Sequence, residues 1–460
     1  MKKITDYNVG FINPPSPFLT DQRVFMSLGI LRVATSLKEH TNKVSFIDLS
    51  GREDNQYELI NNFIEDNSIN ILCFTATTPQ ISIVYDLCQY IKSNHNVKII
   101  LGGPHITLIN SSLENSTDDI KNKSKEHIDR LLKYIDTIVI GDGELSIFNA
   151  ILSDNQIINS ELDDNLFLSN KKYNEIKLDR SFLDIDSYKY EIDGNKSINI
   201  ISQMGCPFQC EFCSGRKSKS FNRIRFRSTD NIIKEIDFLY KNHNYTGFMF
   251  YDDELNLNKH RFKELLEKLI KYQKNNNVKF NFRGFTRSDL LTEKQANLML
   301  EAGFKWLLIG FESGSNKILK NMNKGCTVKQ NTECFRIARK SGLKVKALMS
   351  IGHPGETMDT INESIKWLKK VKPDETDITI ISIYPGSNYF NKSIKISENL
   401  LKYENQDGDK LYIRDIDFLK DANFYKSKND SYISFVHTDN LSENDIIKCR
   451  DKIESITQKF

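Results

Sequence analysis

The chain has few cysteines, few prolines and almost no tryptophan, with 8 Cys, 9 Pro and 2 Trp among 460 residues. Eight thiols in so long a chain are too few for the dense disulfide framework of a small secreted domain. No run of about 18 apolar residues is present, which argues against a transmembrane helix. The first residues, Met-Lys-Lys-Ile-Thr-Asp-Tyr, lack the apolar stretch of a signal peptide. We therefore expect a cytoplasmic protein with no membrane partner.

An excess of charge of one sign is also missing, since 64 Lys and Arg stand against 61 Asp and Glu. Proteins that bind nucleic acid or anionic membranes usually carry a basic excess. We therefore expect no nucleic-acid partner. A length of 460 residues exceeds one ordinary domain and is typical of two or three.

Three of the eight cysteines stand close together, with the spacing C-x3-C-x2-C, at Cys206, Cys210 and Cys213. Three thiolates on one short segment can bind three irons of a [4Fe–4S] cluster and leave the fourth iron open to an exogenous ligand. The alternative is a zinc site, with a histidine or the distant Cys326 as fourth ligand. Structural zinc sites usually take their ligands as two close pairs, and no second pair follows, so the spacing favours the cluster.

Residues 1–152 alternate between short β-branched runs and amphipathic segments. This alternation predicts a doubly wound parallel sheet, a Rossmann-like α/β domain that binds ligands at the carboxyl ends of its strands. The expected strands are 9–13, 44–48, 71–75, 98–101 and 137–140, and the expected helices include 27–39, 57–65 and 81–93. The Asn-, Asp- and Lys-rich segment 111–133 is expected to be an exposed loop that runs into a helix.

Small residues follow four of these strands. Such residues let a large flat ligand approach the backbone closely. The four turns are Asn13-Pro14-Pro15-Ser16-Pro17, Thr75-Ala76-Thr77-Thr78, Gly102-Gly103-Pro104-His105 and Gly141-Asp142-Gly143-Glu144.

A second alternation of strands and helices covers residues 198–390, after a polar linker over 153–197. It predicts six strands of a partial (β/α)6 barrel of the TIM type, with the site at the carboxyl ends of the strands. The expected strands are 198–203, 248–251, 279–284, 306–311, 345–351 and 377–382. Residues 391–460 are expected to form a small C-terminal extension that packs onto a neighbouring domain through its scattered aromatic residues.

Polar motifs follow the barrel strands, and each has a functional and a structural interpretation. Carboxylates accept hydrogen bonds from ammonium and hydroxyl groups, and arginine binds carboxylates bidentately. The same residues can instead cap a helix or pair with local charges. The motifs contain Asp252, Asp253 and Glu254 after the second strand, Arg287 after the third, Glu312 and Ser313 at the end of the fourth, and Gly355 after the fifth.

Together, the four turns, the cysteine triad and the Gly310-Phe311-Glu312-Ser313-Gly314 run resemble the cobalamin-dependent radical S-adenosylmethionine (SAM) enzymes over residues 7–390. The resemblance implies that the three cysteines bind the [4Fe–4S] cluster and that Phe212 lies beside the adenine of SAM. It implies further SAM contacts from Asp252, Asp253, Glu254, Arg287, Glu312, Ser313 and Gly355. The implied cobalamin contacts are Asn13, Pro14, Thr77, Thr78, Gly102, Gly103, His105, Gly141, Gly143 and Glu144.

The resemblance implies an enzyme, with a methyltransferase as the preferred activity. Methylcobalamin and a 5′-deoxyadenosyl radical would serve to methylate an unactivated carbon or phosphorus of a small-molecule or peptide substrate, with flavodoxin or ferredoxin as reductant. A non-methylating enzyme for ring contraction or cyclisation, and a cobalamin-binding module without turnover, remain as alternatives. No catalytic side chain is assigned.

Two departures from the family pattern stand out. No histidine occurs in residues 13–30, so cobalamin is expected base-off and without a protein histidine on cobalt. His105 is expected to be a hydrogen-bonding residue and not a cobalt ligand. Met204 stands where the family often has an arginine before Gly-Cys-Pro, and a thioether cannot replace a guanidinium contact, so shielding of the cluster charge must come from elsewhere.

Overall fold

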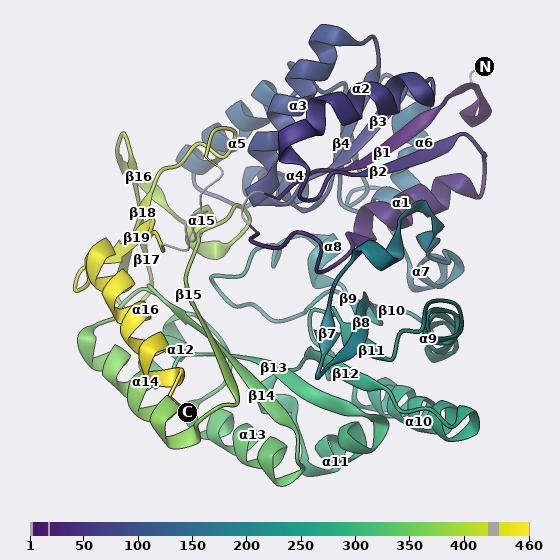
Figure 1. The fold of residues 1–460 in the computed structure, drawn as a ribbon. Coiled ribbons are helices and arrows are strands. Elements are labelled where there is room, and N and C mark those ends of the chain that lie inside the picture. Colours follow the sequence, from purple (N-terminus) through teal and green to yellow (C-terminus); the bar gives the residue numbers. More distant parts are fainter. Residues whose placement is uncertain (1–2, 17–18, 422–431, 460) are drawn as a thin grey trace.

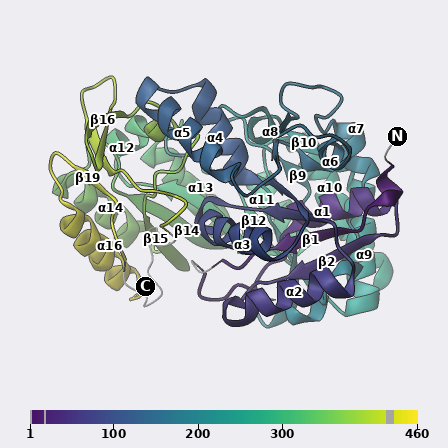
Figure 2. The ribbon, with the colours of Figure 1, turned by 90° about the horizontal axis from the view of Figure 1, so that it is seen from above.

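The computed structural model describes residues 3–16, 19–421 and 432–459, which form two α/β units and a smaller C-terminal sheet (Figure 1). The first unit lies above the second, and the view from above shows its helices over the strands of the second (Figure 2). In the described residues no helix is long and apolar enough to cross a bilayer.

The first unit is built on six parallel strands in the order β2-β1-β3-β4-β5-β6. The direction of winding reverses between β1 and β3, which is where doubly wound sheets bind ligands. The strands are β1 Val9–Asn13, β2 Val44–Asp48, β3 Ile71–Thr75, β4 Lys98–Gly102, β5 Thr137–Ile140 and β6 Ile157–Asn159.

Helices cover both faces of this sheet, as expected of a doubly wound fold. On one face, Phe11, Cys73 and Val139 pack against Ile30 of α1 (Leu28–Lys38) and Ile147 of α6 (Gly143–Leu152). The other face is covered by α2 (Gln56–Asp66), α3 (Ile81–Asn94) and α4 (Pro104–Glu114). Figure 1 shows α2 and α3 on the side away from α1.

Two local expectations differ from the structure. The segment 111–133 is almost entirely helical, because Ile120, Ser124 and Ile128 give α5 (Asp118–Leu131) a buried face at helical spacing. The segment expected to be a linker contains β6, which extends the first sheet, and also α7 (Asn170–Glu175) and β7 (Glu191–Ile192). Strands of two or three residues are too short to show a periodicity.

The second unit has six parallel strands in chain order, β8-β11-β12-β13-β14-β15, with β7 antiparallel to β8 at the edge. This is the expected partial barrel. Its strands are β8 Asn195–Ile200, β11 Gly247–Phe250, β12 Asn281–Phe285, β13 Phe304–Glu312, β14 Lys344–Ile351 and β15 Glu375–Ile380. The helices between them are α9 Thr229–His243, α10 Lys259–Asn276, α11 Glu293–Ala302, α12 Asn316–Asn321, α13 Val328–Lys340 and α14 Met358–Val371.

A two-stranded hairpin follows β8 and leads into the cysteines. It pairs β9 (Gln203–Met204) with β10 (Arg225–Phe226), and the loop between them contains the three cysteines and α8 (Lys219–Asn222). The hairpin lies between the carboxyl end of the barrel and the first unit (Figure 1).

The C-terminal extension packs on neighbouring elements, as expected. After α15 (Asn388–Asn391) it forms an antiparallel sheet, and helix α16 (Glu443–Thr457) packs against β15 and α14. Arg130 of α5 forms an ion pair with Asp417 at 3.0 Å. Strands of this sheet are β16 Ile394–Ser397, β17 Leu400–Glu404, β18 Lys410–Arg414 and β19 Val436–Thr438.

Candidate active site

The cysteine loop begins at a glycine that no other residue can replace without strain. Gly205 has φ +89°, and a Cβ there would overlap the carbonyl oxygen of Arg223, which lies two residues before the opposite strand β10. The loop is then fixed by backbone hydrogen bonds from Cys206 N to Phe221 O (3.0 Å) and from Glu211 N to Met322 O (2.9 Å). Cys210 is buried, and Cys206 and Cys213 are half-buried.

The three thiols lie near enough to influence one another. Burial is the main reason why the pKa of Cys213 is raised to about 11; Arg216 opposes this change, while the neighbouring Cys210 and Cys206 contribute to it. In the described residues, no three His, Cys, Asp or Glu side chains converge on one point as ligands of a single metal ion do. A cluster, in which each thiolate binds a different iron, does not need that convergence.

Asp252 and Asp253 contact the backbone that leads into the cysteine loop. Buried Asp252 accepts hydrogen bonds from Ser202 N (2.7 Å) and Gln203 N (3.1 Å), and Asp253 accepts one from Gly205 N (2.7 Å). Burial raises the pKa of Asp252 to about 7. These two carboxyls follow β11 and position β9 and Gly205, through which β8 leads into the cysteine loop.

Glu254 offers an unused acceptor at the same strand end. Its Oε2 atom is buried and has no hydrogen-bond partner, and burial raises the pKa of the carboxyl to about 7. An unsatisfied buried acceptor costs free energy unless a donor meets it. The position fits a group such as the ammonium of SAM.

Glu312 and Lys324 form a buried ion pair at the end of β13. Lys324 Nζ lies 3.0 Å from Glu312 Oε1, and Ser350 Oγ donates to Glu312 Oε2 at 2.9 Å. Glu312 has φ +63°, an uncommon conformation for a residue other than glycine, at a point where the register with β14 shifts. Burial disfavours the charge of Lys324, but Glu312, Cys210 and Glu254 outweigh it and raise the pKa of the amine. The pair thus places a buried lysine at the end of β13, where its charge interacts with Cys210 of the cysteine loop.

Arg287 is occupied by local contacts. Its guanidinium lies 3.6 Å from the ring centroid of Phe208 in the cysteine loop, forms an ion pair with Asp289 at 2.6 Å and donates to the Lys324 carbonyl. The structure therefore places Arg287 as a brace for the cysteine loop. Its Nε atom is buried and has no hydrogen-bond partner, and the SAM contact of Arg287 that the resemblance implies stays a prediction.

The remaining predicted SAM residues lie around the end of β14. Phe212 contacts the ring of His353 edge-on, with centroids 5.4 Å apart. A Cβ at Gly355, where φ is +78°, would lie 2.6 Å from Asp409 Oδ2 and 2.7 Å from Asn321 Nδ2. Ser313 is buried and interacts with Ser364 Oγ at 3.2 Å, so its hydroxyl serves the local fold.

A cavity of about 210 Å³ opens at the carboxyl ends of β1, β3, β4 and β5 and extends between the sheet and helices α1 and α6. Five predicted cobalamin contacts line it: Gly102, Gly103, Gly141, Gly143 and Glu144. At Gly29 a Cβ would meet nothing within 4 Å, and at Gly102 nothing closer than 3.6 Å. Side chains at these two positions would enter the cavity, so the glycines keep space for a ligand.

The wall of this cavity is mostly apolar, and its polar groups include one buried ion pair. Ile30, Val33 and Ile147 supply apolar surface, and Arg32 Nε lies 3.2 Å from Glu144 Oε1. An apolar pocket with a few fixed polar groups suits a cofactor of mixed character. The residues present therefore fit part of cobalamin at this edge of the sheet.

The other five predicted cobalamin contacts are absent from the cavity wall and are engaged by neighbouring side chains. Asn13 donates to Asp48 (2.8 Å), the carbonyl of Pro14 accepts from Gln80 (3.1 Å), and Thr77 donates to Gln80 (2.8 Å). The rings of His105 and His127 lie 2.8 Å apart between their Nε2 atoms, and His105 Nδ1 lies 3.1 Å from Thr78 Oγ1. Full burial lowers the pKa of His105, in keeping with a neutral hydrogen-bonding residue.

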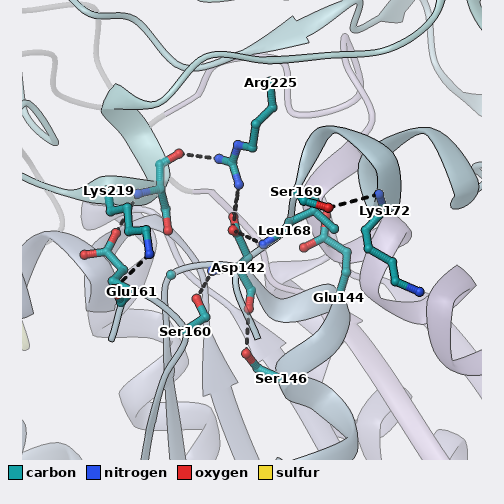
Figure 3. A network of polar contacts seen from close by, with 12 residues as sticks. Asp142, Glu144, Ser146, Ser160, Glu161, Leu168, Ser169, Lys172, Lys219 and Arg225 are labelled. Atoms are coloured by element: carbon teal, nitrogen blue, oxygen red, sulfur yellow. Dashed lines mark hydrogen bonds and ion pairs between the residues drawn. The ribbon is translucent and has the colours of Figure 1, made fainter. Parts of the chain in front are cut away.

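Residues of the second unit form the roof of the cavity. Ile201, Met204, Ser220 and Phe221, from the hairpin and the loop within it, line the same space as the strand ends of the first unit. A buried ion pair fastens the two units: Arg225 Nη1 lies 2.6 Å from Asp142 Oδ2, and Leu168 N donates to the same oxygen at 2.9 Å (Figure 3). Beside it, Ser220 N donates to Glu161 at 2.7 Å.

Beside the two sites, sequence reasoning missed the buried cations Arg32, Arg216, Arg225 and Lys324. The carboxylate partners of Arg32 and Arg225, which are Glu144 and Asp142, lie far along the chain, so no local spacing reveals these two pairs. A signal existed only for Arg216, because the missing arginine before Gly205 required another source of positive charge near the cysteines.

Comparisons with known proteins agree with this geometry. Residues 200–368 match the model of the radical SAM superfamily, and residues 22–132 match the model of the B12 binding domain. An uncharacterized methyltransferase of Pyrococcus horikoshii is 29% identical over 390 residues, which cover 81% of this chain and 79% of the relative.

Two further matches have names that refer to chemistry. An anaerobic magnesium-protoporphyrin IX monomethyl ester cyclase of Rubrivivax gelatinosus is 26% identical over 342 residues, 70% of this chain and 58% of the relative. The solved structure of the radical SAM methyltransferase TsrM from Kitasatospora setae, with cobalamin and a [4Fe–4S] cluster bound, has a TM-score of 0.67 at 14% identity, over 86% of this chain and 81% of TsrM. At that identity TsrM shows the fold alone. On the two domains and the sites they carry, the chain belongs to the radical SAM enzymes with an N-terminal B12-binding domain.

Proposed function

We propose that this protein is a cobalamin-dependent radical SAM methyltransferase, which methylates an unactivated carbon or phosphorus of a small-molecule or peptide substrate. One observation carries the proposal. The hairpin of β9 and β10 roofs the cobalamin cavity through Met204 and, two residues later, begins the cysteine loop at Cys206. A shared wall brings the two cofactor sites together, as joint use of both cofactors on one substrate requires.

The chain's own residues divide into two sets. Cys206, Cys210 and Cys213 would bind the cluster, which when reduced supplies the electron that cleaves SAM to a 5′-deoxyadenosyl radical. Glu254 and Glu312 would accept hydrogen bonds from SAM, while Phe212 and Gly355 lie at the strand ends where its adenine would rest. In the first unit, the glycine turns and the Arg32–Glu144 pair would bind cobalamin, the carrier of the methyl group.

Cobalamin is proposed to bind base-off, with no histidine of the protein on cobalt. Residues 13–30 contain no histidine, and His105 is engaged by Thr78 and His127 outside the cavity wall. The apolar space between the sheet and α1 would accept the displaced tail. A flavodoxin or ferredoxin as reductant and a cytoplasmic location complete the proposal.

Anaerobic reconstitution with iron, sulfide, cobalamin and methyl-labelled SAM tests the function. We expect about four irons per chain, and both S-adenosylhomocysteine and 5′-deoxyadenosine as products, because one SAM cannot be methyl donor and radical source in the same turnover. With an acceptor present, the label should enter the product. The electron paramagnetic resonance spectrum of bound cob(II)alamin should lack nitrogen superhyperfine splitting.

The control is the triple variant with Cys206, Cys210 and Cys213 replaced by alanine, which should keep cobalamin and lose iron and 5′-deoxyadenosine. Bound zinc without iron would refute the cluster. Turnover that yields 5′-deoxyadenosine with neither S-adenosylhomocysteine nor label transfer would replace the methyltransferase by the cyclase chemistry that the name of the Rubrivivax relative indicates. A nitrogen splitting on cobalt would refute the base-off proposal alone.

A further inference from the structure

A buried guanidinium lies against the cysteine loop and has no role in the sites described above. Arg216 follows Cys213 by three residues, in the turn that leads to α8, and is 6% exposed. Its Nη1 atom donates to the carbonyl oxygen of Cys206 at 2.5 Å, and its Nε atom donates to the Ser214 carbonyl at 3.4 Å. The side chain therefore spans the loop from its third cysteine back to its first.

The charge of Arg216 lies beside the segment that contains the three thiols. Burial disfavours that charge, but Cys213, Cys206, Asp253 and Cys210 outweigh burial and raise the pKa of the guanidinium. One cation thus interacts with all three proposed iron ligands.

Arg216 differs in this respect from the second cation beside the loop. Lys324 interacts with Cys210, but Glu312 lies 3.0 Å from its amine and offsets most of its charge. Within the described parts of the chain, no carboxylate oxygen lies within 4.0 Å of the Arg216 guanidinium. The positive charge of Arg216 is therefore the less compensated of the two.

A cluster bound by three thiolates gains one negative charge when it accepts an electron. A fixed cation in a dry site stabilises the reduced form more than the oxidised form, which raises the reduction potential. We propose that Arg216 sets the reduction potential of the cluster and supplies the positive charge that Met204 cannot give. Arg216 is a positioning and charge-compensating residue, and the inference rests on the cluster of the proposed function.

Redox titration of the reconstituted full-length protein, followed by electron paramagnetic resonance of the reduced cluster, tests the inference. We expect Arg216→Gln to make one-electron reduction about tenfold less favourable, a shift of about 59 mV to lower potential. Arg216→Lys keeps the charge and should recover most of the shift. Lys217→Gln is the matched control, since it removes one positive charge from the adjacent exposed residue and should leave the potential unchanged.

An unchanged potential in Arg216→Gln, with a full complement of iron, would overturn the inference and leave the proposed function standing. If Arg216→Gln binds no cluster, the variant Asp253→Asn tests the inference in its place. It removes a negative charge that interacts with Arg216 and Cys213, and it should raise the reduction potential of the cluster. No rise in that variant would also overturn the inference. Wild-type protein without iron would instead refute the proposed function itself.

Discussion

Buried carboxyls with raised pKa values are concentrated at the strand ends of the barrel. Asp252, Glu254 and Glu356 each have a pKa raised to about 7, and burial is the largest cause in all three. Asp252 and Glu356 accept backbone N–H donors, which oppose the shift without cancelling it. The site thus contains carboxyls that change charge near neutral pH.

The raised pKa of Glu356 predicts how the stability of the protein depends on pH. Its folded pKa of about 7 lies above the ordinary 4.5, so the folded state binds more protons than the unfolded state between these values. The stability it contributes is present below about pH 4.5 and is lost as pH rises through 7. Glu356→Gln should flatten the fall in unfolding free energy between pH 5 and 8, by up to about 3 kcal/mol.

Anaerobic urea unfolding at several pH values measures the effect. Glu363→Gln, an exposed position on the same helix α14, serves as control and should leave the slope unchanged. Equal slopes in wild type and Glu356→Gln would contradict the raised pKa.

The chemistry of single residues could be predicted from sequence only where it is local. The three thiols and the turns at Gly102 and Gly141 stand on short segments whose spacing is visible in the chain. The local contacts of Arg287 and Ser313 could not be predicted, because their partners come from other loops. The SAM contacts expected of these two residues stay predictions.

At the scale of elements, the hairpin of β9 and β10 determines where the cysteine loop starts. Its turn requires Gly205, where φ is +89° and the Arg223 carbonyl leaves no room for a Cβ. Gly408, in the turn between β17 and β18, has a similar φ of +81° but nothing within 4 Å. Both glycines have a left-handed φ, but only Gly205 lacks room for a Cβ. Comparing alanine variants at the two positions therefore distinguishes the effect of backbone strain from that of steric overlap.

Gly205→Ala should therefore displace the cysteine loop and lose most of the bound iron. Gly408→Ala should keep the iron and lose only about 1–2 kcal/mol of stability, the usual cost of a left-handed alanine. Iron content after reconstitution and the unfolding free energy are the measurements. Full iron in Gly205→Ala would show that the loop does not depend on this hairpin.

Most elements were predictable because their residue patterns are strong. The expected strands agree with β1 to β5 and with the six barrel strands to within a few residues, since β-branched and aromatic runs mark them. The polar surface of α5 concealed its buried face, and β6 has only three residues. The sequence analysis missed these two elements for a physical reason, because the residues that bury them lie in a distant part of the chain.

At the scale of the whole molecule, the two domains are joined by the buried Asp142–Arg225 pair (Figure 3). Removing one partner of a buried pair leaves an uncompensated charge and costs about 3–5 kcal/mol. Asp142→Asn and Arg225→Gln should each destabilise by that order and weaken cobalamin retention, because the pair lies beside the cavity roof. The double variant should lose less than the sum of the two.

Unfolding free energies and cobalamin retained after gel filtration complete this double-mutant cycle. Lys268→Gln, which breaks an exposed pair with Asp230, is the control and should cost at most about 1 kcal/mol. Strict additivity of the two single changes would show that the pair does not couple the domains.

The roof over the cobalamin cavity has a consequence for protein engineering. A chimera that exchanges the first domain after β6, at Asn159, would move the strand ends but leave behind Met204, Ser220 and Phe221. The transplanted domain would then present an open apolar trough to solvent in its new host. A transplanted segment that keeps the roof of the cavity has to extend to β10 at Phe226, and it then includes the cysteine loop.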